Sequence, residues 1–155
     1  MDTKSDRVNP IERVAYAFVG LSSGDAMLRL YLLISWSPQP EMVTLVIFAM
    51  FSFVGWLCVG LPIALVLPTR SITHLSWPLA LVVGVVVGPV ALLGAMLGIF
   101  LTSYVCPIGF VSGMPGYMIS KVEPYAFSIL ISTVSFGVYV ALLRTQTRGR
   151  HNQVT

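Results

Sequence analysis

Four long stretches of apolar residues limit what this chain can fold into. They cover approximately residues 11–36, 42–67, 77–102 and 123–143. An α-helix rises about 1.5 Å per residue, so about 20 apolar residues cross a hydrocarbon core of about 30 Å. Charged residues make up 10% of the chain, whereas about 25% is typical of soluble domains. We therefore predict an all-α fold, a polytopic bundle of four transmembrane helices at residues 11–143.

The first apolar stretch is open to three interpretations. Asn9 and Pro10 are suited to the cap and first position of a helix. Residues 22–25 read Ser-Ser-Gly-Asp and interrupt the apolar run. The helix is therefore continuous, or broken at residues 22–24, or removed as a signal peptide with its apolar part at 14–21. The sequence leaves the choice open.

The remaining segments are defined by proline, glycine and polar residues. The second stretch is longer than a bilayer core requires, so we expect tilt or a kink, and Pro62 lacks the N–H that would bond the Cys58 carbonyl. Residues 103–122 are rich in glycine, proline and apolar side chains, which predicts an outer loop folded over the bundle as a lid or a plug. Residues 1–10 and 144–155 are predicted to be polar tails.

The distribution of basic residues predicts the orientation in the membrane. With both termini in the cytoplasm, Lys121 is the one basic residue of the outer loop. Arg29 falls within the first helix. The other basic residues then lie inside: Lys4, Arg7, Arg13, Arg70, Arg144, Arg148 and Arg150. This asymmetry follows the positive-inside rule and predicts a multi-pass protein of a bacterial-type plasma membrane.

Asp25 and Arg29 are the ionisable pair expected at membrane depth. Their spacing of four residues places both on one helix face, with the acid on the N-terminal side. Charges inside a bilayer cost about 2.5–3.5 kcal/mol on insertion scales, which favours pairing. The pair is predicted to be an internally neutralised bridge, an ion-coupled site, or a contact to a partner subunit.

Small residues form a stripe on the third predicted helix, and the first GxxxG in it is Gly84/Gly88. Small residues let helix backbones approach closely where lipid provides no hydrophobic drive for association. The stripe is predicted to pack against a neighbouring helix of the chain or a second copy of the protein. Its members are Ala80, Gly84, Gly88, Ala91, Ala95 and Gly98.

Hydroxyl groups share one face of the fourth predicted helix. Such side chains usually bond a carbonyl of their own helix or a neighbouring helix. They also suit the wall of a polar path or a substrate cleft. The face consists of Tyr125, Ser128, Ser132, Ser135 and Tyr139.

The sequence lacks recognisable catalytic or cofactor motifs. The two cysteines and two histidines have no metal-ligand spacing, and the basic residues form no stripe typical of nucleic-acid binding. We therefore predict a protein that is not an enzyme and uses no cofactor or metal.

The first functional hypothesis is assembly. The chain would act as an accessory, partner-binding or self-associating membrane subunit, whose partners are the lipid bilayer and a second copy or another membrane protein. The alternative is a small oligomeric transporter or channel that uses Asp25, Arg29 and the hydroxyl face.

Overall fold

The computed structural model describes residues 8–35, 42–105 and 121–151. Over these residues the chain forms helices and no β-strand, which confirms the all-α prediction. In chain order the elements are α1 (Pro10–Ser35), α2 (Met42–Gly55), a π-helix η1 (Trp56–Gly60), α3 (Leu61–Val66), α4 (Thr69–Thr73), α5 (Trp77–Val105) and α7 (Glu123–His151).

Four helices are long and apolar enough to cross a membrane, as the sequence predicts. They span Pro10–Ser35, Phe48–Val66, Trp77–Gly98 and Glu123–Thr147. Large apolar side chains on their outer faces are exposed, among them Ile34, Val86 and Leu97. Such faces suit contact with lipid chains, which do not penalise exposed apolar surface. The helices thus indicate a multi-pass membrane protein.

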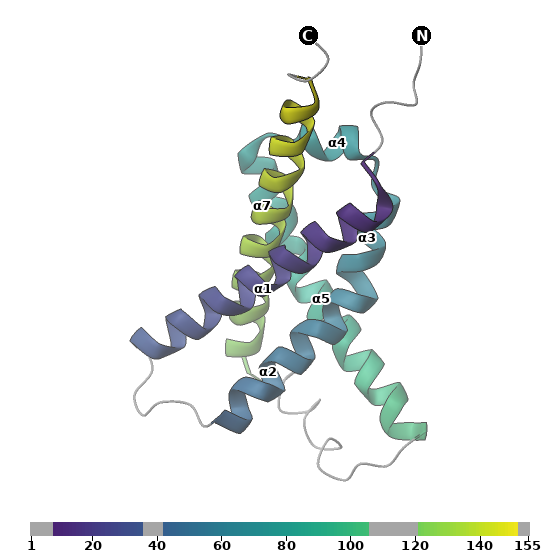
Figure 1. Ribbon diagram of the computed structural model, residues 1–155. Helices are drawn as coiled ribbons and strands as arrows, with labels where there is room; N and C mark the ends of the chain where they lie inside the picture. Colours follow the sequence, from purple (N-terminus) through teal and green to yellow (C-terminus); the bar gives the residue numbers. More distant parts are fainter. Residues whose placement is uncertain (1–7, 36–41, 106–120, 152–155) are drawn as a thin grey trace.

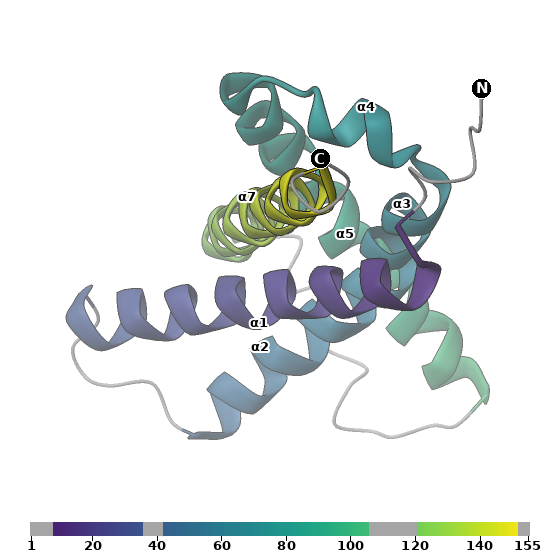
Figure 2. The same cartoon turned by 45° about the horizontal axis from the view of Figure 1, so that its top comes forward.

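The helix α7 is the centre of the bundle. α1 crosses it on one side and α5 packs along another, while α2 and η1 lie against α5 (Figures 1 and 2). Buried side chains of α7 such as Val140 and Leu143 are completely enclosed by these neighbours. α7 thus contacts α1, α5 and the short helix α4.

Glycines allow α1 and α5 to approach α7 backbone to backbone. A Cβ atom at Gly20 would lie 2.5 Å from the carbonyl oxygen of Ser135. On the side of α7 that faces α5, Cβ atoms at Gly84 and Gly88 would lie 2.6 Å from Thr133 Cα and 2.7 Å from Ser128 O. Real side chains do not fit at these distances, so each crossing requires glycine.

Close to Pro62, where the sequence predicts tilt or a kink, the second span contains the π-helix η1. Between α2 and α3, the N–H of Leu61 bonds the carbonyl of Trp56, which is five residues earlier. The wider turn accommodates a proline that cannot donate a hydrogen bond and whose ring crowds the preceding turn. The second span is thus one helical path with an irregular turn in its middle.

Some boundaries differ from those that the sequence predicts. α7 continues past residue 143 to His151, whereas α1 is continuous through residues 22–24, in agreement with one of the three interpretations and not with the broken helix. The extension of α7 is held by a hydrogen bond of 2.7 Å from the Gln146 amide to the Glu12 carboxylate. The short connection between the second and third spans contains the helix α4.

The outer loop is described only at its two edges. Residues 103–105 belong to α5, and residues 121–122 lead into α7. The part at 106–120, with the choice between a lid and a plug, lies outside the described residues.

Two arginines fasten the end of the bundle where α4 lies. The Arg13 guanidinium donates to the carbonyls of Leu65, at 3.3 Å, and Leu67. Arg144 donates to the carbonyls of Thr73, at 3.1 Å, and Leu75. These carbonyls end α3 and α4, where helices lack internal donors.

Candidate functional site

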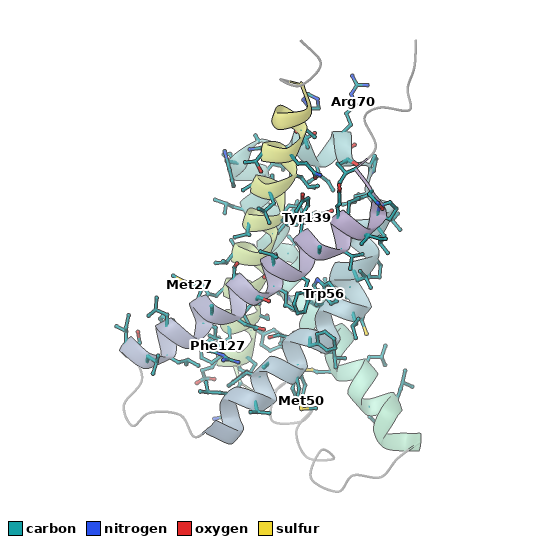
Figure 3. The ribbon with its side chains drawn as sticks, in the orientation of Figure 1. Met27, Met50, Trp56, Arg70, Phe127 and Tyr139 are labelled. Atoms are coloured by element: carbon teal, nitrogen blue, oxygen red, sulfur yellow. The ribbon has the colours of Figure 1, made fainter. Side chains whose placement is uncertain are left out.

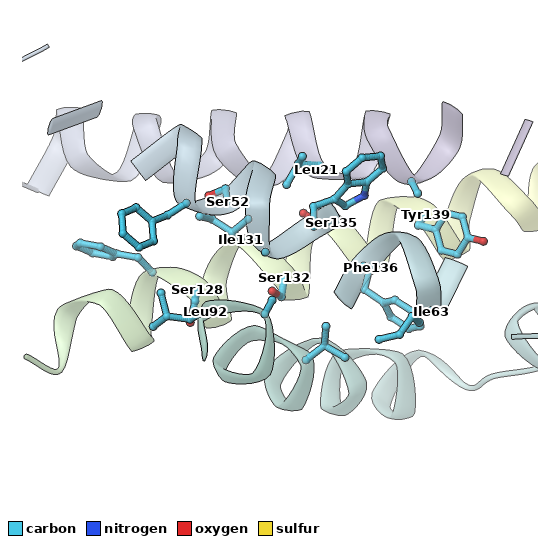
Figure 4. A pocket seen from close by; sticks show the side chains of 18 of the residues that line it. Leu21, Ser52, Ile63, Leu92, Ser128, Ile131, Ser132, Ser135, Phe136 and Tyr139 are labelled. Carbon is cyan, nitrogen blue, oxygen red and sulfur yellow. The ribbon is translucent and has the colours of Figure 1, made fainter. Parts of the chain in front are cut away.

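A cavity of about 110 Å³ runs through the middle of the bundle, along one face of α7 (Figure 4). The first and last α7 residues of its wall, Pro124 and Tyr139, are about 22 Å apart at the usual helical rise, so the cavity is long and narrow. The side chains that α7 contributes recur every three to four residues: Pro124, Phe127, Ser128, Ile131, Ser132, Ser135, Phe136 and Tyr139.

The other walls come from all the neighbouring helices. α1 contributes Ala17 and Leu21, and α5 contributes Ala91 and Leu92. The second span contributes residues from α2 through α3, including its irregular turn: Phe48, Phe51, Ser52, Gly55, Trp56, Gly60, Ile63 and Ala64. Most of these side chains are apolar, and the described lining residues carry no acidic or basic group.

Four of the five residues of the predicted hydroxyl face line this cavity. Ser128, Ser132, Ser135 and Tyr139 contribute to its wall, and Figure 4 shows all four along the same side of α7. Tyr125 instead packs against an apolar cluster formed by α2 and α5. The face is therefore turned toward the interior of the chain.

Two of these hydroxyl groups donate hydrogen bonds to backbone carbonyls. Ser128 donates to the carbonyl of Tyr125 at 2.8 Å. Tyr139 donates to the carbonyl of Ala64 in α3 at 3.3 Å. The latter bond satisfies a carbonyl near the irregular turn and joins α7 to the second span.

Two further polar atoms of the cavity wall are buried without a partner among the described residues. They are Ser135 Oγ on α7 and Trp56 Nε1 on η1. Figure 3 shows Trp56 near the middle of the bundle, far from Arg70 at the α4 end. A buried donor without an acceptor costs about 1–3 kcal/mol, so both atoms would gain from a ligand in the cavity.

Asp25 is connected to the cavity wall through Ser52. The Asp25 side chain is half-buried on α1, and its carboxylate accepts a hydrogen bond from the Ser52 hydroxyl of α2. Arg29 attracts this carboxylate by charge, but its own side chain is exposed. The predicted ion pair stays a prediction, whereas the Asp25–Ser52 bond is a contact that the sequence did not reveal.

The predicted small-residue stripe makes its contacts within the chain. Ala80, Gly84, Gly88 and Ala95 are buried. Gly84 and Gly88 lie against α7, as described above. The next members face the second span, since a Cβ at Gly98 would lie 3.2 Å from Val54 Cγ1, and Ala91 forms part of the cavity wall. Contact of the stripe with a second copy stays a prediction.

Sequence reasoning missed three features of the site. Gly20 and Gly24 form a GxxxG pair that was hidden by the polar residues around it, and Gly24 faces Ser135 Oγ and Ile131 O. Ser52 and Trp56 lie in an apolar stretch with no pattern that distinguishes them. Only the three-dimensional packing identifies them as parts of one wall.

The arrangement suits a small neutral molecule with an apolar body. Apolar lining with a few placed polar groups is typical of ligand sites, and a cavity between the helices of a bundle is a usual location for them. No protein-family model, curated protein or solved structure matches this chain.

Proposed function

We propose that this protein binds a small, neutral, mostly apolar molecule inside its helical bundle, as part of a small membrane transporter. The observation that carries the proposal is the cavity beside α7, whose wall contains four residues of the hydroxyl face and Trp56. The proposal keeps the hydroxyl face of the predicted transporter alternative, whereas Asp25 and Arg29 do not line the cavity.

The irregular second span also favours transport. Binding sites of membrane transporters tend to involve interrupted helices near the middle of the bilayer. Here the π-helix η1 interrupts the span, and both Trp56 and Gly60 from this turn line the cavity. π-Turns occur often at functional sites.

Asp25 would influence the site indirectly. Its carboxylate is bonded to Ser52, and Ser52 lies in the cavity wall. A change in the Asp25 side chain is therefore transmitted to the cavity through one hydroxyl group.

Binding can be tested with trifluoropentane, a small apolar probe, in protein purified into lipid nanodiscs. Fluorine NMR separates saturable binding from linear partition into the lipid. The parent protein should give a bound signal that saturates near one probe per chain. Ser132→Leu should abolish that signal, because the leucine side chain occupies the cavity.

The matched control is Val86→Leu, which also enlarges a side chain but on the exposed face of α5. It should bind trifluoropentane as the parent does. If the parent shows only linear partition, or if Ser132→Leu still gives the saturable signal, the binding function is wrong.

Assembly with another membrane subunit is the second candidate, and the exposed side of α1 favours it. Arg29 and Ser22 are exposed on this spanning helix, and Ser22 donates to the Phe18 carbonyl at 3.0 Å. A guanidinium exposed within a spanning helix gains from an acidic partner side chain or a lipid phosphate. The small-residue stripe supports this candidate less, since its contacts are internal.

The assembly candidate predicts that Arg29 controls the size of the complex. In mild detergent, the parent chain should elute as an oligomer or with a co-purifying membrane protein, and Arg29→Gln should elute as a monomer with the same thermal stability. A parent chain that is already monomeric in nanodiscs and in detergent would contradict the assembly role.

A further inference from the structure

We infer that the cavity selects ligands that carry a hydrogen-bond acceptor, such as a short-chain alcohol or ketone, over hydrocarbons of the same length. The inference rests on the proposed binding function and names the ligand class. The recognising atoms are Trp56 Nε1 and Ser135 Oγ, which are buried and have no partner among the described residues.

The Trp56 indole is fixed in its position by three neighbours. Phe18 of α1 meets it edge-on with ring centroids 6.0 Å apart, and Phe53 stacks on it at 6.0 Å. Gly60 lies so close that a Cβ there would be 2.8 Å from Trp56 Cδ1. These contacts hold the indole beside the cavity, and its N–H can donate a hydrogen bond but not accept one.

Ser135 differs from the other serines whose hydrogen bonds are seen in this bundle. Ser22, Ser23 and Ser128 each donate to a carbonyl of their own helix, at 3.0, 2.8 and 2.8 Å. The Ser135 hydroxyl makes no such bond among the described residues, although it is buried in the wall. It therefore retains both a donor and an acceptor for a ligand.

Gly24 explains why Ser135 is enclosed. The close approach of α1 at Gly24 brings the helix backbone against Ser135 Oγ. This contact covers the hydroxyl on the α1 side and excludes bulk solvent there. Gly20 and Gly24 of α1 both lie at this crossing point, against Ser135.

The charge of the wall determines the remaining ligand chemistry. An ionised ligand would be buried without a counter-charge, at a cost of several kcal/mol, since the described lining residues carry no charged group. A neutral oxygen acceptor satisfies the Trp56 N–H, and an apolar chain fills the rest of the narrow space. A site built to bond an oxygen rejects the analogue that lacks it.

The test compares trifluoropentanol with trifluoropentane by competition, with fluorine NMR of the 155-residue chain in nanodiscs. After correction for partition into lipid, the parent should bind the alcohol at least about tenfold more tightly, the factor expected for one buried bond. Trp56→Phe and Ser135→Ala should each reduce this preference while the hydrocarbon still binds.

Two matched controls lie outside the cavity. Trp77→Phe changes a tryptophan at the start of α5, and Ser22→Ala removes an exposed hydroxyl of α1. Both should keep the preference of the parent for the alcohol. Comparison of hydrocarbon binding in all variants shows whether each one is folded.

The outcomes separate the inference from the function on which it rests. Equal, saturable binding of both probes would overturn the inference and leave the binding function intact. Saturable binding of neither probe, as expected if the cavity holds only water, would overturn both. An undiminished preference in both Trp56→Phe and Ser135→Ala would also overturn the inference.

Discussion

The glycines of this chain differ in the atoms that an added Cβ would contact. At Gly24 the added carbon would be 2.5 Å from a backbone oxygen of α7, and at Gly88 it would be 2.7 Å from another. At Gly98 the nearest atom belongs to a valine side chain, 3.2 Å away. At Gly137 there is nothing within 4 Å. A backbone atom of a packed helix cannot move away from an added Cβ, whereas a neighbouring side chain can change its rotamer.

This series predicts a graded effect of glycine-to-alanine changes on stability. Gly24→Ala and Gly88→Ala should each lower the free energy of unfolding by about 1–3 kcal/mol, as overpacking does. Gly98→Ala should cost less. Gly137→Ala should be neutral or stabilising by up to about 1 kcal/mol, because alanine favours helix. Thermal aggregation of the purified variants measures the order, and equal loss for Gly24 and Gly137 would contradict the packing.

The sequence predicts only part of this residue-scale picture. Gly84 and Gly88 are visible as candidates because they stand in a regular stripe of small residues. Their neighbour in space is not encoded in that spacing, since a small-residue face suits any helix. Gly24 was read with Asp25 as an interruption, because sequence alone does not separate a helix break from a helix crossing.

Helices of the bundle are joined by a few polar contacts in addition to apolar packing. α1 is linked to α2 by the Asp25–Ser52 bond, and α7 is linked to the segments around α4 by Arg144. The Arg144 guanidinium also lies over the Trp77 ring, 4.9 Å from its centroid. The Asp25–Ser52 and Arg144–Trp77 contacts join two spans, and the Arg144 hydrogen bonds join α7 to the segment between two spans.

Removal of the Arg144 contacts should loosen the segment around α4. Arg144→Gln loses donors to the carbonyls of Thr73 and Leu75 and the contact with Trp77. Since each hydrogen bond contributes about 1 kcal/mol, amide exchange in residues 70–76 should become about tenfold faster. Arg70→Gln is the control, because the Arg70 side chain is exposed. Unchanged exchange in Arg144→Gln would show that the contacts do not hold this segment.

The Asp25–Ser52 bond predicts coupling between α1 and α2. Asp25→Asn and Ser52→Ala should each destabilise the protein, and the double variant should lose less than the sum of the two. Coupling energies of hydrogen bonds between membrane helices average about 0.6 kcal/mol, and a charged acceptor favours a larger value. Reversible unfolding in mixed micelles measures the cycle. Strict additivity would mean that the two side chains do not interact.

The length of the apolar stretches predicts the four spans, but the sequence does not predict the residues at which the helices end. The four spans follow from stretches of apolar residues that match a bilayer. The extension of α7 to His151 was missed because its last turns are polar and depend on Gln146 and Arg144 contacts with distant segments. Pro62 indicated an irregularity, but the π-turn is one of several ways to accommodate a proline.

The whole molecule has two distinct ends. The first turn of α1, the last turns of α7 and the short helix α4 lie at one end, joined by Glu12–Gln146 and Arg144–Thr73 contacts. The other end holds the last turn of α1, the first turns of α2 and α7 and the end of α5 (Figure 1). Four spans of alternating direction require this arrangement, and it places Arg13, Arg70 and Arg144 at the same end.

The orientation of the molecule in the membrane is the last prediction. Basic residues near the ends of spans are retained in the cytoplasm, so the end with Arg13, Arg70 and Arg144 should face inward. Reporter fusions at residue 72 and after residue 155 should read cytoplasmic, and a fusion at residue 112 should read periplasmic. Replacing Arg13 and Arg70 with glutamine should weaken this preference and yield a mixed population. A periplasmic C-terminus together with a cytoplasmic residue 112 would invert the orientation. Opposite locations for residue 72 and the C-terminus would contradict the four-span arrangement itself, because α5 and α7 would then not both cross the membrane.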